Sequence, residues 1–187
     1  MSKYDLAYKS IDELPVYTGA DATVDKIALY DSSANRMEYI SYGGATIAAG
    51  STLTLTASTH SRLRGVIVNL DTAAGSTVTL PAATGTGNIY RFRVSVLATT
   101  NSHIVKVANS TDVFQGFAAI SDTDTSSACS MFMTASTSDT ITLNRSTMGS
   151  VTVGEYIEIE DVAAGFFSIR AYLSGTGAVA TPFSATV

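Results

Sequence analysis

Residues 77–96 contain two short runs in which apolar and polar side chains alternate, and this alternation constrains the fold more than any other feature of the chain. Val78 and Leu80 alternate with threonines until Pro81, which has no N–H to donate to a strand ladder. Gly85 and Gly87 then provide the backbone freedom that a turn needs. The segment therefore predicts two strands joined by a turn.

The second run has a different chemistry on each of its faces. With a side-chain period of two, one face carries Tyr90, Phe92, Val94 and Val96, and the other carries Arg91, Arg93 and Ser95. One face is suited to burial and the other to solvent. Such a strand is typical of a scaffold or of a binding surface, and it contains no recognisable catalytic motif.

Similar runs recur from residue 46 to residue 187, separated by turn-forming residues. The predicted strands are centred on Leu53, Val68, Val78, Phe92, Val105, Phe114, Met131, Ile141, Val151, Ile157 and Ile169, with an edge strand within 178–187. Only residues 58–64 have a helical character. Regular short strands of this kind predict an all-β fold, an antiparallel β-sandwich or barrel-like body of the jelly-roll type.

Residues 1–45 differ in composition from the rest of the chain. They hold three of the four lysines and seven of the sixteen acidic residues. Residues 25–41 contain two alternating runs around the turn formers of 31–35, which predicts a small β-hairpin. An isolated hairpin is marginally stable in water, so we expect this N-terminal arm to be an attachment segment that leans on the body or on another chain.

Charge and hydropathy limit the partners of the protein. Charged residues make up 14% of the chain, and the net charge of −5 argues against binding to nucleic acid, which selects basic surfaces. No window approaches the ~18 apolar residues of a membrane span, and the N-terminus lacks the apolar core of a signal peptide. We therefore expect a protein that is made in the cytosol, stays soluble and binds no membrane.

Candidate catalytic and metal-binding residues are isolated from one another. His60 and His103 lack partners at metal-ligand spacing, and both are interpreted as exposed loop residues. Cys129 lies in an apolar run and is interpreted as a small buried hydrophobe. No nucleophile elbow or phosphate-binding loop is present. The sequence therefore predicts a protein that is not an enzyme and uses no cofactor or metal.

Two acidic clusters leave alternatives open. Asp122 and Asp124, with Ser126 and Asp112, offer oxygen ligands for calcium, although a solvated turn explains them better. Glu158 and Glu160 lie ~7 Å apart on one strand face, a separation that would suit a glycosidase pair. An exposed strand face is the favoured interpretation of these two glutamates, because few aromatic residues are available for binding sugar.

The arginines are the best candidates for contacts with a partner. Arg62 and Arg64 lie two residues apart, as do Arg91 and Arg93, so that the two side chains of each pair can point the same way. The planar guanidinium favours fixed contacts with carboxylates. The alternatives are two solvated strand faces, or a patch formed by Arg62, Arg64, Arg91 and Arg93 that docks on an acidic partner.

Five runs of the body have a recognisable sequence: STLTLTAST (51–59), AGSTVTLPAATGTGNIYRFRV (74–94), NSHIVKVANSTDVFQG (101–116), SDTITLN (138–144) and GTGAVATPFSATV (175–187). These runs resemble the small structural proteins of tailed bacteriophages, especially marine and cyanobacterial phages. In the arm, DKIALYDSSANRMEYI (25–40) is similar to a short module of phage head and tail appendage proteins.

The resemblance implies a virion structural protein made in the host cytoplasm. Its expected role is that of a capsid decoration (cement) protein that binds the outer surface of the head and stabilises the shell. The expected partners are the major capsid protein and further copies of the chain in a homotrimer. The alternative is a head-fibre or tail-appendage subunit that recognises the host surface.

Overall fold

The computed structural model describes residues 26–31, 36–41, 46–60, 66–124 and 128–187, and nearly all regular structure in them is β. The prediction of an all-β fold is confirmed. The chain divides into two compact units, Met1–Gly43 and Gly44–Val187, whereas its composition predicts a boundary after residue 45.

The first unit contains one hairpin in its described part. Strands β1 (Lys26–Asp31) and β2 (Arg36–Ser41) pair antiparallel, with Lys26 opposite Ser41 and Asp31 opposite Arg36. This is the hairpin that the alternation of residues 25–41 predicts. Residues 1–25 of the arm lie outside the described residues.

The described part of the second unit consists of two sheets and one short helix, α1 (Ala57–His60). The seven-stranded sheet has the order β10 (Cys129–Met133), β9 (Val113–Asp122), β13 (Phe166–Gly175), β12 (Tyr156–Ala163), β7 (Ile89–Val94), β5 (Ile67–Leu70) and β3 (Thr46–Ala48). The five-stranded sheet has the order β14 (Phe183–Ser184), β11 (Thr140–Leu143), β8 (His103–Lys106), β6 (Thr77–Thr79) and β4 (Thr52–Thr54). Residues 183–184 fulfil the prediction of a C-terminal edge strand.

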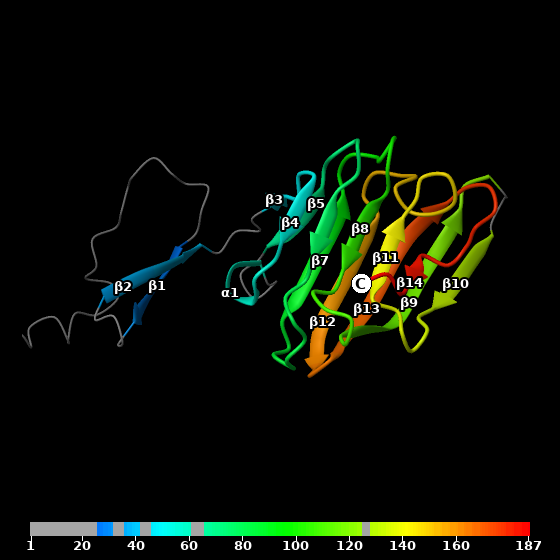
Figure 1. The fold of residues 1–187 in the computed structure, drawn as a ribbon. Coiled ribbons are helices and arrows are strands. Elements are labelled where there is room, and N and C mark those ends of the chain that lie inside the picture. The colour runs from blue at the N-terminus through cyan, green and yellow to red at the C-terminus, as the bar shows by residue number, and fades with distance from the viewer. Residues whose placement is uncertain (1–25, 32–35, 42–45, 61–65, 125–127) are drawn as a thin grey trace, which may run out of the picture. The chain divides into compact units, whose positions relative to one another are not determined.

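The two sheets share one hydrophobic core, in a sandwich-like arrangement of two layers (Figure 1). Strand register aligns the core residues into rows that cross each sheet. In the larger sheet the row is Ile47, Val68, Phe92, Ile157, Ala171, Ala118 and Phe132. In the smaller sheet it is Leu53, Val78, Val105, Ile141 and Phe183. The apolar residues of the alternating runs are therefore the residues that face the opposite sheet.

The sheets are mixed, which corrects the expectation of a mainly antiparallel, jelly-roll-like body. From β3 to β8 the chain crosses to the other sheet after every strand. Each strand therefore runs in the same direction as the strand that preceded it in its own sheet. Strands β3, β5 and β7 are consequently parallel neighbours, and so are β4, β6 and β8. Strands β9 and β13 are parallel too. The antiparallel pairs are those of β12 with β7 and β13, of β11 with β8 and β14, and of β9 with β10.

Residues 77–96 contain two strands, as predicted, but β6 and β7 belong to different sheets, so that residues 80–88 connect the two layers. One local prediction was wrong. Val151 and Val153 were expected in a strand, yet they lie in a loop. There the backbone N–H groups of residues 150–152 donate to the Glu155 carboxylate and are not available to a ladder.

Buried carboxylates hold several loops in this way. Asp161 accepts the N–H groups of Thr84, Gly85 and Thr86, together with the Thr86 hydroxyl. Three other buried acidic residues also accept backbone N–H groups. Asp112 accepts the N–H of Ala83, and Asp139 accepts the N–H groups of residues 186 and 187. Glu155 accepts the N–H groups of residues 150–152. Burial opposes ionisation of Asp161, but the hydrogen bonds outweigh it and hold the pKa of this carboxyl below its ordinary value. The loops are thus fixed by buried carboxyl groups that accept their backbone N–H groups.

Strands β9 and β13 lie close together at Gly116, which is paired with Ile169. The φ of Gly116 is +151°, and a Cβ built on it would clash with the backbone oxygen of Ile169 on β13. We expect Gly116→Ala to lower the free energy of unfolding by about 3 kcal/mol or more, since β9 must separate from β13. Gly87→Ala is the control: Gly87 has φ +70° but open space around it, and should cost only about 1 kcal/mol. Chemical denaturation measures both, and equal losses would contradict the steric argument.

The hydrogen bonds that Asp161 accepts from residues 84–86 make the stability of the fold depend on pH. The folded-state pKa of Asp161 is lowered. Its contribution to the free energy of unfolding is therefore present above the unfolded-state pKa of 3.8 and is lost as pH falls through the folded-state pKa. Asp161→Asn should therefore lower the free energy of unfolding by about 2 kcal/mol at neutral pH, because the amide N–H groups of asparagine would face the N–H donors of the loop. The stabilities of variant and wild type should converge in strong acid. Glu160→Gln is the control, since Glu160 is half-buried on the same strand. If the stability difference between Asp161→Asn and wild type were the same at every pH, the role of the ionised Asp161 carboxylate would be refuted.

Candidate functional site

The outer face of the seven-stranded sheet carries a set of interacting charged and aromatic side chains. Two neighbouring rows cross it, in register with the buried rows. The tyrosine row runs across all seven strands through Ala48, Asn69, Arg93, Tyr156, Tyr172, Ala119 and Met131. The arginine row runs from β7 to β10 through Arg91, Glu158, Arg170, Phe117 and Met133. We call the surface formed by these two rows the outer face.

Glu158 is the centre of the charged half of the outer face. Its Oε2 accepts the Nε–H of Arg91 at 2.8 Å and the hydroxyl of Tyr156 at 2.9 Å. Its Oε1 accepts from Nη1 of Arg170 at 3.3 Å. Burial opposes ionisation of Glu158, but the bonds from Arg91 and Tyr156 prevail and lower the pKa of the carboxyl. Two arginines from different strands are thereby fixed around one carboxylate.

An aromatic ring and a side-chain amide make additional contacts with Arg91 and Arg93. The Arg91 guanidinium lies 5.9 Å from the centroid of the Tyr156 ring, within the range of a cation–π contact. Arg93 donates to Oδ1 of Asn69 through Nε at 3.3 Å and Nη2 at 3.0 Å. The charged half therefore presents side chains in fixed positions, which reduces the entropy lost when a partner binds.

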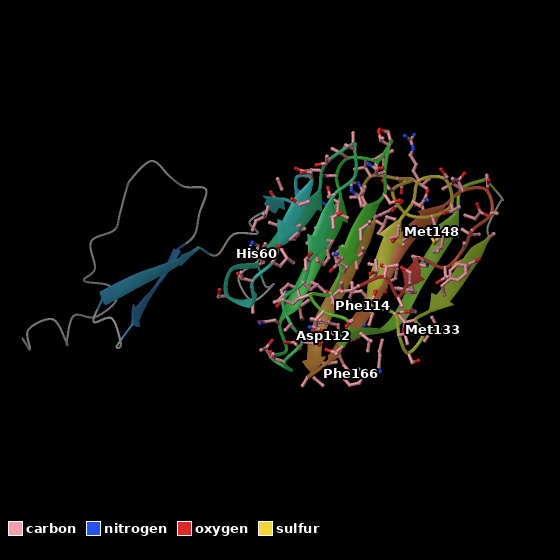
Figure 2. All side chains as sticks on the ribbon, in the orientation of Figure 1. His60, Asp112, Phe114, Met133, Met148 and Phe166 are labelled. Carbon is pink, nitrogen blue, oxygen red and sulfur yellow. The ribbon has the colours of Figure 1, made fainter. Side chains whose placement is uncertain are left out.

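The other half of the outer face is apolar and exposed. Met131 is 62% exposed, Met133 68% and Tyr172 55%, and Phe117 and Ala119 lie between them on β9. Figure 2 shows Met133 on β10 at one end of the body and His60 at the other. Methionine and aromatic side chains on an exposed surface mark a site of protein contact more often than a catalytic site. The outer face thus combines an apolar half with a fixed charged half.

The arginines of the sequence analysis divide into two groups. Arg91 and Arg93 lie on the outer face, as the period of two predicts, and Arg91 binds an acidic group of its own chain. Arg62 and Arg64 lie outside the described residues, so that a patch of all four remains a prediction. No local pattern predicts that Arg170 lies near Arg91, because the two residues are brought together by Glu158 on the strand between them.

The candidate acidic residues have structural contacts. Glu158 forms two salt bridges and accepts the Tyr156 hydroxyl, so that it is an ionised residue of the outer face. Asp112 is buried and accepts from Ala83 and Asn109. Asp122 accepts the N–H of Asp124, as expected of a turn, and Asp124 accepts that of Gly177. Ser126 lies outside the described residues. In the described ranges no three His, Cys, Asp or Glu side chains gather in a group suited to a metal ion.

Two interpretations of single residues were wrong. His103 is buried in β8, where Nδ1 accepts the Ser76 N–H at 3.0 Å and Nε2 lies 2.8 Å from the Val96 oxygen. Burial lowers the pKa of His103, so that it is a neutral structural residue. Cys129 is exposed on β10, whereas the sequence predicted burial. The run from Cys129 to Met133 belongs to a sheet edge, which an apolar run by itself does not reveal.

The missed residues of the site are Met131, Met133 and Tyr172. Alternation was visible around each of them, but its period does not distinguish the core side of a strand from an exposed apolar side. A signal was present in Met131-Phe132-Met133, since three consecutive apolar residues place apolar side chains on both faces of a strand.

No protein-family model, curated protein or solved structure matches this chain. No helix in the described part of the chain has the length and apolar character needed to span a bilayer. The outer face therefore has to be interpreted from its own geometry and chemistry.

The Glu158 network predicts a small, pH-dependent contribution to stability. Glu158→Ala should lower the free energy of unfolding by about 1 kcal/mol at neutral pH, because it leaves Arg91, Arg170 and Tyr156 without their common acceptor. The lowered pKa means that this contribution disappears as pH falls through the folded-state value. Glu160→Ala is the matched control, and urea denaturation of both variants measures the effect. Equal losses in the two variants would show that the network is not coupled.

Proposed function

We propose that this protein is a structural component of a tailed-phage virion that decorates the outer surface of the head as a cement protein. Its partners are the major capsid protein and further copies of itself in a homotrimer. The proposal assigns it no catalytic activity, cofactor, nucleic acid or membrane partner. The arm, residues 1–45, serves as an attachment segment, and the protein is made in the host cytoplasm.

One observation carries the proposal: the outer face is a broad surface of seven hydrogen-bonded strands, apolar at one end and charged at the other. Burial of Tyr172 and Met133 against a partner would supply affinity, since aromatic and methionine side chains are enriched at interfaces. The fixed arginines would provide orientation. The resemblance of the body to small phage structural proteins supports the same class of function.

Repetition strengthens such a contact on a capsid. A trimer placed on a three-fold position would bind through three copies of the same surface, and each contact raises the effective concentration of the next. Modest affinity per copy is then sufficient for full occupancy. Such repetition favours a shell-bound protein over a fibre, for which few copies are expected.

The copy number in purified virions tests the proposal. Quantitative mass spectrometry should find this chain in a fixed, simple ratio to the major capsid protein. Virions that lack the chain should release DNA at a lower temperature than wild-type virions. A few copies per particle would instead assign the protein to a head fibre or tail appendage, and absence from the particle would refute both roles.

Substitutions on the outer face test which surface docks. Tyr172→Asp places a charge in the apolar half, and we expect it to lower the affinity for chain-free capsids by about tenfold or more. Val153→Asp is the control, because Val153 is 65% exposed in the loop before β12. Capsid co-sedimentation measures both variants. Unchanged binding of Tyr172→Asp would move the docking surface elsewhere on the protein.

A further inference from the structure

Strand β10 forms one edge of the seven-stranded sheet, and its backbone is aligned for pairing with another strand. Thr134 donates its N–H to the Gly116 oxygen, and Asp122 donates to the Ala128 oxygen. In an antiparallel ladder the bonded residues alternate, so that the even-numbered residues bond to β9. The N–H and C=O groups of Cys129, Met131 and Met133 therefore point away from the sheet.

This edge differs from the other edges in the described parts of residues 46–187. Strands β3 and β4 have three residues each and β14 has two, and short edge strands resist further pairing. Strand β10 has five residues, Cys-Ser-Met-Phe-Met, with no charge and no proline. Lysine and proline are the usual protection of a sheet edge against another strand, and β10 has neither.

We propose that β10 binds β10 of a second copy of this chain, antiparallel, about a two-fold axis at Met131. This is the register that pairs all five residues of the strand. Met131 then faces its own equivalent, and Cys129 faces Met133 of the partner. The pairing joins the two seven-stranded sheets into one continuous sheet.

Charge favours a second copy in this orientation. Asp122 and Asp124 lie at the end of the β9–β10 hairpin that precedes β10, whereas residues 134–138 beyond its other end carry no charge. Antiparallel pairing places the acidic end of one copy beside the uncharged end of the other. Parallel pairing would bring the acidic ends together, at a cost in like-charge repulsion.

The side chains are also complementary in this arrangement. The apolar half of each outer face reaches the axis through Met131 and Met133, so that two exposed patches become one continuous surface across it. On the core side, Phe132 lies against the hydrophobic core and would face Ser130 of the second copy. The contact uses only this edge, and it is independent of any role on a capsid.

Sedimentation equilibrium of the full chain tests the contact. The mass of the wild-type protein should double as its concentration rises, because the species present at low concentration, whether monomer or oligomer, associates in pairs. Met131→Lys places two ammonium groups at the axis and should raise the dissociation constant by about a hundredfold. Val153→Lys should behave as wild type. A wild-type mass that does not rise, or that rises equally in Met131→Lys, would overturn the proposal.

Cross-linking tests the register, since Cys129 is the single cysteine of the chain. In the variant Cys129→Ser with Met131→Cys, the two thiols would be ~5.5 Å apart between Cα atoms, a separation that permits a disulfide. Mild oxidation should then give a covalent dimer, whereas Cys129→Ser with Val153→Cys should remain uncross-linked. Equal cross-linking of the two variants would refute the register. Cross-linking to capsid protein without self-cross-linking would assign the edge to that partner instead.

Discussion

Hydrogen bonds from loop N–H groups to buried carboxylates are the interaction on which this fold depends. A chain that crosses between two layers after almost every strand has many connections, and their backbone donors cannot all reach a ladder. Asp112, Asp139, Glu155 and Asp161 supply the missing acceptors in the interior. Without them the connections would leave buried N–H groups unpaired, and each such group costs about as much as a lost hydrogen bond.

The same use of acids determines the chemistry of the surface. Residues 46–187 contain nine acidic side chains, and four of them are buried. A fifth, Glu158, is paired with two arginines. A chain with few charges thus places many of the acidic side chains of its body in internal structural roles.

Alternation alone predicts most strands of this protein and the division of each strand into buried and exposed residues. Phe92 and Ile157 face the core, and Arg91 and Arg93 face outward, as the period of two requires. The predictions failed where a distant residue decides the outcome. Val151 and Val153 are β-branched residues in an alternating run, as in a strand, but the backbone N–H groups of residues 151 and 152 donate to the Glu155 carboxylate. The direction of neighbouring strands was also hidden, because it depends on which layer each strand joins.

The candidate site shows the same division between local and distant information. The sequence identified Arg91 and Arg93, since their spacing is local. It did not identify Arg170 or Tyr172, which join the outer face through the register of β13 with β12. The exposure of Cys129 depends on the position of β10 as the last strand of the sheet, and no local pattern encodes the order of strands.

The winding of the chain also has a consequence for its biosynthesis. Strands β3 to β8 pair with partners that lie two strands earlier or later, so that each can find a neighbour soon after it leaves the ribosome. Strand β9 is different: apart from its hairpin with β10, its long parallel partner is β13, which is translated more than one third of the body later. Until then one side of β9 is an open edge in the nascent chain. Completion of the larger sheet therefore waits for nearly the last segment to be synthesised.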